Sequence, residues 1–325
     1  MTKRVFVTGG AGFIGRAVVR QLREGGYDVT AVLRDGTSAP ALRESGVRVM
    51  AGDLRSTDEI RAAMDGCDAV IHLAGSYQVG IPVRHRSQMY EANVAVARRV
   101  LDAAIEARIP RIVDVSTVNV FGDTHGQIVD ETYRRDPAEG FLSYYDETKY
   151  LGFLAAEARI AAGAPVIIVQ PGDTYGPGDH SAIGSRLQAA FDGTARVIVF
   201  GDMGISAVHV DDLAAGILAA LDRGRIGEAY VLSGECLTLK DAIEVAARAA
   251  GREPPRIRVP GALMRLAVPL GRFAARVGTL RLNMAEVVHA ADGVTYWASH
   301  AKAAAELGHA PRPLRQGVVD AFGHR

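Results

Sequence analysis

Apolar residues in the first half of the chain form short runs that alternate with longer amphipathic stretches. The runs are rich in Val, Ile and Ala and predict six buried strands, at residues 5–7, 28–33, 47–51, 69–73, 111–116 and 166–169. Between them apolar residues recur at helical spacing, and we expect helices at residues 57–64, 87–107 and 143–162. Apolar strands that alternate with helices are typical of a parallel sheet covered on both faces. The pattern therefore predicts an α/β fold.

The first predicted strand leads directly into a glycine-rich turn at residues 8–15, Thr-Gly-Gly-Ala-Gly-Phe-Ile-Gly, and a helical pattern follows. This order places free backbone N–H groups and the positive end of the helix dipole where a dinucleotide pyrophosphate binds. One glycine makes the tight turn, one lets the backbone approach the phosphates, and one lets helix and strand pack closely. We expect cofactor binding by Gly9, Gly12, Phe13, Ile14 and Gly15, although glycine-rich turns also occur as plain connections.

The ends of the next strands extend the predicted cofactor site, because parallel sheets bind ligands beyond the carboxyl ends of their strands. Arg34 follows the second strand, where a guanidinium favours the 2′-phosphate of NADP. Asp35 would repel that phosphate if it turned inward, so the sequence favours NADP(H) over NAD(H) without excluding the latter. Asp53 follows the third strand and would accept a hydrogen bond from the adenine amino group or cap the next turn.

The third and fourth strands supply the remaining contacts expected from position alone. Leu54 follows Asp53, and Leu73, Ala74 and Gly75 follow the fourth strand, where small residues let the backbone approach a cofactor. His72 lies on this apolar strand, and we interpret it as an interior histidine rather than a catalytic one.

Tyr145 and Lys149 are the strongest catalytic candidates. Residues four apart on a helix lie on one face, so the phenol and the ammonium lie together in the predicted helix 143–162. A phenol has an ordinary pKa of about 10. A lysine cation beside it, helped by a positive nicotinamide ring, would favour the phenolate and lower the pKa toward the working range. Ser116 and Thr117, at the end of the fifth strand, are both candidates to hold the substrate oxygen.

Composition indicates an enzyme of the cytoplasm. The 325 residues suffice for two domains, or for one domain with an appended lobe. Lys plus Arg and Asp plus Glu number 37 each, so net charge gives no sign of nucleic acid as a partner. Cys67 and Cys236 lie far apart without metal-ligand spacing, which predicts a reducing compartment and no metal site. The sequence shows neither a signal peptide nor an apolar run of transmembrane length, so we expect no stable membrane insertion.

Together these residues resemble an extended short-chain dehydrogenase/reductase of the NAD-dependent epimerase/dehydratase family, over nearly the whole chain. The resemblance selects Thr117 as the hydroxyl of a catalytic triad with Tyr145 and Lys149. It implies that Asn93 helps to position active-site water and the lysine. Residues 171–178, from Pro171, match the segment that passes the nicotinamide, and residues 209–212, His-Val-Asp-Asp, match the return into the core domain. Gln170 departs from the family, in which arginine is usual at that position.

The resemblance also implies a Rossmann-type doubly wound parallel sheet with a smaller α/β substrate-binding lobe. We expect the dinucleotide-binding domain at residues 1–172 and 205–234, and the lobe at residues 173–204 and 235–325. A homodimer through a four-helix bundle is implied as well, and the wide apolar arcs of the predicted helices 87–107 and 143–162 fit it. The candidate residues of the substrate pocket are Tyr77, His125, Phe141, Tyr175 and His180.

Two features favour a branch of the family. Ile205 stands where sugar-nucleotide enzymes usually carry an arginine for the nucleotide diphosphate, and isoleucine cannot neutralise that charge. Residues 260–277 are apolar with three interspersed arginines. They resemble a helix that borders a lipophilic pocket in the dihydroflavonol reductase and 3β-hydroxysteroid dehydrogenase-like branch, where Arg34 also has a counterpart. A packed lobe helix or association with a membrane surface would also explain this segment.

We therefore expect an NADP(H)-dependent oxidoreductase that interconverts a carbonyl and an alcohol on an apolar or aromatic small molecule, with Tyr145 as acid and base. The alternative is a sugar-nucleotide epimerase or dehydratase that retains its cofactor. A regulatory protein that binds NAD(P) without turnover is disfavoured, because Thr117, Tyr145 and Lys149 are all present.

Overall fold

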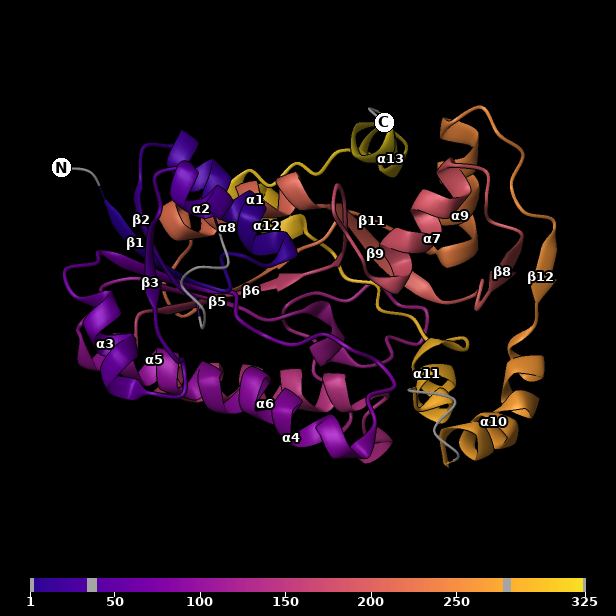
Figure 1. Cartoon of the computed structure of the whole chain (residues 1–325), viewed down its shortest axis with the longest axis horizontal. Coiled ribbons are helices and arrows are strands. Elements are labelled where there is room, and N and C mark those ends of the chain that lie inside the picture. Colours follow the sequence, from indigo (N-terminus) through magenta and orange to yellow (C-terminus); the bar gives the residue numbers. More distant parts are fainter. Residues whose placement is uncertain (1–2, 34–39, 277–281, 324–325) are drawn as a thin grey trace.

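A seven-stranded sheet forms the centre of the larger part of the molecule (Figure 1). The computed structural model describes residues 3–33, 40–276 and 282–323. The strand order is β10-β6-β5-β4-β1-β2-β3, and every neighbouring pair is parallel. The strands are β1 (Arg4–Thr8), β2 (Asp28–Leu33), β3 (Arg48–Ala51), β4 (Ala69–His72), β5 (Ile112–Val115), β6 (Val166–Pro171) and β10 (Ala229–Leu232). The predicted doubly wound parallel sheet is confirmed.

Helices cover both faces of this sheet, and each face has its own apolar core. One face packs against α1 (Phe13–Glu24), α8 (Val210–Arg223) and α12 (Ala301–Leu307), through residues such as Leu22, Leu213 and Leu307. The other face packs against α3 (Thr57–Met64), α5 (Val96–Glu106) and α6 (Tyr144–Ala161). We assigned residues 301–307 to the lobe from sequence, yet α12 packs on α8 and β10 of the large sheet.

The predicted helix 87–107 is continuous but not uniform. It consists of α4 (Arg86–Tyr90), one π-helical turn (Glu91–Ala95) and α5. Much of the wide apolar arc that we expected to fit a homodimer is covered within the chain, since Val94, Val100 and Leu101 are completely buried. The apolar stripe of α5 therefore gives no argument for a homodimer.

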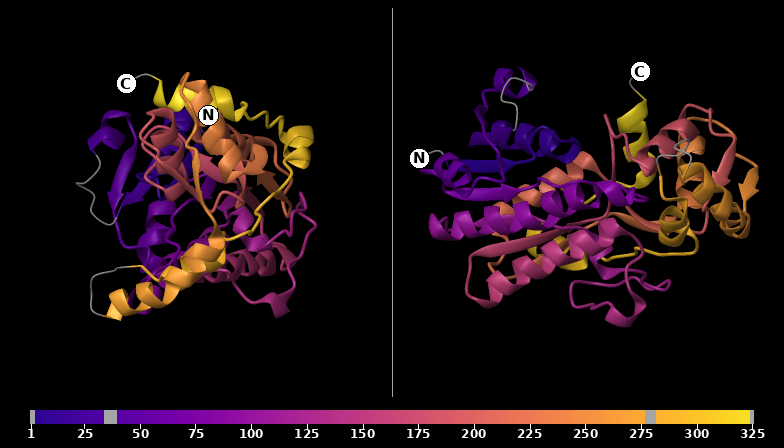
Figure 2. Two further views of the ribbon diagram at one scale, coloured as in Figure 1. Left: turned by 90° about the vertical axis from the view of Figure 1, so that its right-hand side faces the viewer. Right: turned by 60° about the horizontal axis from the view of Figure 1, so that its bottom comes forward.

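A smaller group of strands and helices forms the other end of the molecule (Figures 1 and 2). Its three-stranded sheet has the order β11-β9-β7, and two further strands, β8 and β12, pair in parallel. The strands are β7 (Asp173–Tyr175), β8 (Val197–Val199), β9 (Gly204–His209), β11 (Glu235–Thr238) and β12 (Ile257–Val259). The helices are α7 (Ala182–Phe191), α9 (Leu239–Ala249), α10 (Gly261–Arg276), α11 (Met284–Ala291) and α13 (Leu314–Phe322). The remaining helical segments are α2 (Pro40–Glu44), η1 (Val83–His85), η3 (Val118–Phe121) and η4 (Pro137–Glu139).

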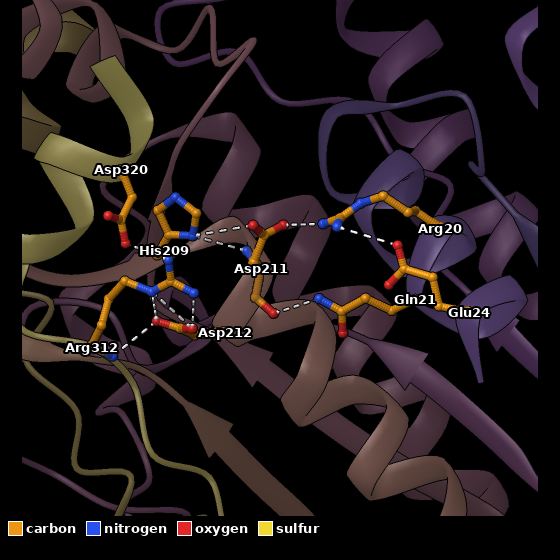
Figure 3. A network of polar contacts seen from close by, with 8 residues as sticks. All are labelled: Arg20, Gln21, Glu24, His209, Asp211, Asp212, Arg312 and Asp320. Atoms are coloured by element: carbon orange, nitrogen blue, oxygen red, sulfur yellow. Dashed lines mark hydrogen bonds and ion pairs between the residues drawn. The ribbon is translucent and has the colours of Figure 1, made fainter. Parts of the chain in front are cut away.

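A polar network joins the two parts at the His-Val-Asp-Asp segment (Figure 3). His209 caps α8 by accepting the backbone N–H of Asp211 at 3.2 Å. Asp211 pairs with Arg20 on α1 at 2.5 Å, and Asp212 pairs with Arg312, which precedes α13, at 2.7 Å. The segment therefore fastens the first helix of the large domain to the C-terminal part of the chain.

Candidate active site

The glycine turn after β1 leaves no room for side chains. Gly9 has a φ of +71°, which favours glycine, and a Cβ added to it would lie 2.7 Å from the backbone nitrogen of Ala74. A Cβ on Gly15 would lie 2.1 Å from the carbonyl oxygen of Gly9. Gly12 begins α1 without a side-chain cap, and the first turn, with Phe13 and Ile14, contains no acidic residue. The first-turn N–H groups therefore remain available to a phosphate, and the cradle fits the pyrophosphate of a dinucleotide.

A buried Thr8–His72 pair holds β4 against this turn. The Thr8 hydroxyl oxygen accepts the backbone N–H groups of Leu73 and Ala74, each at 3.2 Å. Its own hydrogen is therefore directed to Nδ1 of His72, 2.7 Å away. Burial lowers the pKa of His72 to about 3, so the imidazole is neutral. Its position agrees with an interior histidine, and the pair sets the approach of Leu73, Ala74 and Gly75 to the cradle.

The other predicted cofactor residues lie outside the glycine cradle. Arg34 lies outside the described residues. Asp53 accepts hydrogen bonds from Arg55 through both carboxylate oxygens, at 3.0 Å from its backbone N–H and at 2.8 Å from Nε. This is the local capping that we considered as the alternative to an adenine contact. Leu54 packs partly buried against the core, and Pro171 ends β6.

Thr117, Tyr145 and Lys149 meet at the end of β5. Ser143 caps α6 by accepting the N–H of Asp146, and this fixes the first helical turn, which carries Tyr145. Lys149 lies one turn further, and its Nζ donates to the carbonyl of Val115 at 3.1 Å. Thr117 follows β5 and is 7% exposed, near the Tyr145 phenol, whose pKa burial raises and Thr117 partly lowers. The geometry thus brings these three side chains together.

Burial dominates the acid–base properties of this group. The Tyr145 side chain is 8% exposed, and burial raises its pKa well above 10. Burial also lowers the pKa of Lys149, and the charge of Asp114 raises it. Burial therefore raises the phenol pKa in the chain by itself, and the lowering that we expect from Lys149 together with a bound nicotinamide stays a prediction. Tyr145 carries its proton here, as a proton donor in a reduction must.

Asn93 lies in the π-helical turn and connects two active-site segments. Its Oδ1 accepts the backbone N–H of Ser76 at 2.7 Å, and its Nδ2 donates to the Ser76 carbonyl at 2.9 Å. The same Nδ2 donates to the Thr148 hydroxyl at 3.0 Å. Thr148 precedes Lys149, so Asn93 fastens the loop after β4 to the helix that carries the lysine. The described contacts do not test the predicted role of Asn93 toward water.

The five predicted pocket residues lie in different surroundings. The Tyr77 ring stands edge-on to the Tyr145 ring, with 4.8 Å between centroids, and is 54% exposed. Phe141 lies under the Arg135 guanidinium, 4.4 Å from its carbon. His125 and His180 are exposed, and Nε2 of His125 pairs with Glu139 at 2.9 Å. Tyr77 is thus the pocket candidate in direct contact with the triad.

Tyr175 is not a pocket residue, and that prediction is wrong. Its side chain is completely buried in the apolar core of the lobe, edge-on to His209. A Cβ on Gly317 would lie 1.9 Å from its hydroxyl, so α13 covers the ring directly. The motif position places Tyr175 near the cofactor segment along the chain, but the side chain points into the lobe.

Two buried acids beside the triad were missed by sequence reasoning. Asp146 is completely buried, accepts Nδ2 of Asn119 at 3.0 Å, and burial raises its pKa to about 7. Glu286 on α11 accepts the backbone N–H of Tyr144 at 2.9 Å and that of Gly80 at 3.3 Å. The Ser143-x-x-Asp146 spacing is a capping signal that could have indicated the first. No local signal indicates Glu286, because 142 residues separate it from Tyr144.

Neither a metal site nor a membrane span is found in the part of the chain that the structure describes. There, no group of three or more His, Cys, Asp or Glu side chains could hold an ion, and no helix is long and apolar enough to cross a bilayer. One recess of about 310 Å³ lies between α10 and α11, and another of about 280 Å³ lies beside β8, β12 and the start of α10; no triad residue lines either. Arg265, in the arginine-containing apolar segment, pairs there with Asp292.

Comparison with known proteins identifies the family. The model of the NAD dependent epimerase/dehydratase family matches residues 5–233. The chain belongs to this family. A Synechocystis protein that carries the provisional name dihydroflavonol 4-reductase is 30% identical over 97% of this chain and 92% of its own length. A Stigmatella aurantiaca protein is named 4-hydroxy-2-methyl-3-oxo-4-farnesyl-3,4-dihydroquinoline-1-oxide ketoreductase. It is 28% identical over 98% of this chain and 95% of its own length.

Among solved structures, the chain is similar to the crystal structure of gox2253. It superposes with a TM-score of 0.83 at 29% identity and covers 99% of this chain and 97% of that one. Membership in the epimerase/dehydratase family makes this chain an NAD(P)-dependent enzyme of the extended short-chain dehydrogenase/reductase type. The glycine cradle after β1 agrees with that cofactor class.

Proposed function

We propose that this enzyme interconverts a carbonyl and an alcohol on an apolar or aromatic small molecule with NADP(H). The observation that carries the proposal is the buried, protonated Tyr145, with Thr117 beside it and the Tyr77 ring 4.8 Å away. A proton donor beside an aromatic ring suits an uncharged ketone or aldehyde with an apolar or aromatic body.

Each residue of the triad has a distinct task in this reaction. The bound nicotinamide supplies hydride to the carbonyl carbon in reduction and takes it back in oxidation. Tyr145 donates its proton to the carbonyl oxygen, and Thr117 holds that oxygen by a hydrogen bond. Lys149, which donates to the Val115 carbonyl at 3.1 Å, would hold the ribose hydroxyls of a bound nicotinamide nucleotide and supply positive charge near the phenol. Asn93 holds the Ser76 loop beside Thr148, the residue that precedes this lysine, by hydrogen bonds to both.

The substrate class rests on the surroundings of Tyr77 and on Ile205. Ile205 is completely buried in the lobe core, so the position where a diphosphate arginine is usual offers no cation. The Stigmatella relative is named for a ketone on a farnesylated quinoline, an apolar aromatic molecule. The second candidate, a sugar-nucleotide epimerase or dehydratase, is favoured by the description of the family itself.

The deciding experiment mixes purified protein with panels of carbonyls and alcohols and follows nicotinamide absorbance, with NADP and NAD in parallel. Tyr145→Phe keeps the ring and removes the proton, so turnover should fall by at least ~10²–10⁴-fold while cofactor affinity stays nearly unchanged. Tyr144→Phe is the matched control, because it makes the same chemical change one residue away, and it should retain activity. Near-normal rates in Tyr145→Phe would remove this residue from the mechanism, and turnover of sugar nucleotides alone would favour the second candidate.

The preference for NADP rests on Arg34. A bidentate hydrogen bond from a guanidinium to the 2′-phosphate contributes roughly 1.5–3 kcal/mol, or about one to two decades of affinity. Arg34→Ala should weaken NADP by that factor and leave NAD almost unchanged, as measured by titration of cofactor fluorescence. If wild type binds NAD better, or if the variant weakens both cofactors equally, Arg34 does not select NADP.

We also propose a homodimer that uses the outer faces of α4, α5 and α6. Leu154 on α6 is 39% exposed and Tyr90 on α4 is 38% exposed, between ion pairs such as Arg159–Asp102. These two exposed apolar residues support the proposal. The apolar residues of α5 do not, because they are buried within the chain. Light scattering at micromolar concentration tests it, and a monomer would contradict it.

A further inference from the structure

A chain of hydrogen bonds runs from the triad to a buried carboxylate. Thr117 Oγ1 donates to Oδ1 of Asn119 at 3.0 Å, and Nδ2 of Asn119 donates to Oδ1 of Asp146 at 3.0 Å. At the other end of the chain, Thr117 lies near the Tyr145 phenol, whose pKa burial raises and Thr117 partly lowers. Asp146 is completely buried, and its second oxygen, Oδ2, has no partner among the described residues. The acid is therefore connected to the reacting group, yet incompletely satisfied.

The hydrogen inventory fixes the direction of this chain while Asp146 is ionised. A carboxylate only accepts, so the Asn119 amide must turn its NH₂ group toward Asp146 and its oxygen toward Thr117. Thr117 has a single hydroxyl hydrogen, and it donates this hydrogen in its hydrogen bond to the amide oxygen of Asn119. Thr117 then has no hydrogen left for a substrate oxygen.

Protonation of Asp146 reverses the requirement. A carboxylic acid can donate to the amide oxygen, and the Asn119 amide fits the same space when rotated by half a turn. Its NH₂ group then donates to Thr117 Oγ1. The Thr117 hydrogen becomes free to point at the reacting oxygen, where a carbonyl reduction needs a donor.

We propose that Asp146, acting through Asn119, decides whether Thr117 donates or accepts a hydrogen bond at the reacting oxygen. Asp146 is thus a positioning residue for carbonyl reduction, and this role rests on the proposed function. The proton concerned stays on the enzyme through a catalytic cycle, because Tyr145 supplies the one that the product alcohol receives.

The surroundings of Asp146 suit a group that changes charge near neutrality. Burial raises its pKa to about 7, against the lowering effect of hydrogen bonds from Ser143 and Asn119. The charge of Arg135 lowers this pKa further, and that of Glu286 on α11 raises it. The phenols whose own pKa the Asp146 charge raises are those of Tyr77, Tyr145 and Tyr296.

The test compares the pH dependence of carbonyl reduction in wild type, Asp146→Asn and Asn119→Ala. In wild type, kcat should fall by about 10-fold or more as Asp146 ionises, approaching the ~10²–10³-fold that loss of a donor to an oxyanion costs. Asp146→Asn imitates the neutral acid, so this step should vanish and the rate above neutral pH should exceed that of wild type. Asn119→Ala should also lose the step, although Asp146 still titrates, because the connection is cut. KM should change little in either variant.

An infrared difference measurement supplies a readout without turnover. The carbonyl band of a protonated buried acid should appear in wild type and Asn119→Ala as the pH falls, and be missing in Asp146→Asn. Its absence from wild type between about pH 5 and 9 overturns the proposal. If Asn119→Ala reduces carbonyls normally and still shows the pH step, the proposal is also overturned. Asp146 would then act on the reaction through its charge and not through Asn119. No hydride transfer with any carbonyl overturns the proposed function, and this role with it.

Discussion

Asp212 lies in the first turn of α8 and Asp146 in the first turn of α6, but their carboxylates have very different hydrogen-bond partners. The Arg312 guanidinium donates to both oxygens of Asp212, and the Arg312 backbone N–H adds a bond at 2.9 Å (Figure 3). Asp146 receives an amide instead of a cation, and one of its oxygens has no partner among the described residues. The first acid is held in an ion pair with Arg312, whereas burial raises the pKa of the second to about 7.

The difference follows from how each charge is compensated. Hydrogen bonds from Arg312 offset the desolvation of Asp212, and the pKa of Arg312 rises for the same reason. Asp146 has no ion-pair partner in the described part of the chain, so burial decides its protonation and its pKa rises. A paired acid fastens elements together, whereas an unpaired one can respond to pH. The contrast separates an acid that holds elements together from the acid to which we assign a role in the reaction.

Removing the paired acid should have the largest effect on stability. Asp212→Ala leaves Arg312 partly buried without its main partner, so we expect the free energy of unfolding to fall by about 3 kcal/mol. Urea denaturation at neutral pH measures this. A loss below about 0.5 kcal/mol would mean that the network in Figure 3 contributes no more than an ordinary surface pair.

Removing the unpaired acid should have a smaller effect of the opposite sign. The folded-state pKa of Asp146, about 7, lies above its ordinary value of 3.8, so the folded protein binds the extra proton between these values. Its contribution therefore makes folding less favourable as the pH rises through that window. Asp146→Asn should raise the free energy of unfolding by about 1–3 kcal/mol at pH 8 relative to wild type and lose the gain near pH 4. A gain of equal size at both pH values would contradict the assignment.

The smallest effect is expected at the exposed edge of the network. The Arg20 side chain is 50% exposed where it pairs with Asp211, so Arg20→Ala should cost less than about 1 kcal/mol and added salt should reduce the cost further. Thermal unfolding at low and high salt checks this. A loss as large as that of Asp212→Ala would show that the pairs act as one unit.

Local sequence predicted the regular elements well. The helix expected at residues 57–64 has those bounds in the structure, because Ser56 caps it and Asp58 and Glu59 follow in the first turn. The helix expected at residues 87–107 contains a π-helical turn that no pattern revealed. A Cβ on Gly152 would lie 2.7 Å from the Asn93 carbonyl, so this turn reflects packing against α6.

The site was predictable where its residues share a helix and not where they meet through the fold. Tyr145 and Lys149 are one turn apart, so periodicity placed them together. Asn119 and Asp146 are 27 residues apart and belong to different elements. Tyr175 was misplaced because a motif gives position along the chain and not the direction of a side chain. Burial, which sets the protonation of Tyr145, depends on all the elements around it.

Glu286 has a consequence for the order in which the enzyme becomes active during synthesis. It lies in the last eighth of the chain, yet it accepts the N–H of Tyr144 at the start of α6 and that of Gly80 in the loop beside Tyr77. The Rossmann strands and the glycine cradle are all made earlier. A nascent chain that still has α11 inside the ribosome can therefore form the dinucleotide cradle, but it lacks the carboxylate that anchors the first turn of α6. We expect cofactor binding to precede catalytic competence, so that the chain turns over substrate only after α11 has left the ribosome and Glu286 has reached Tyr144.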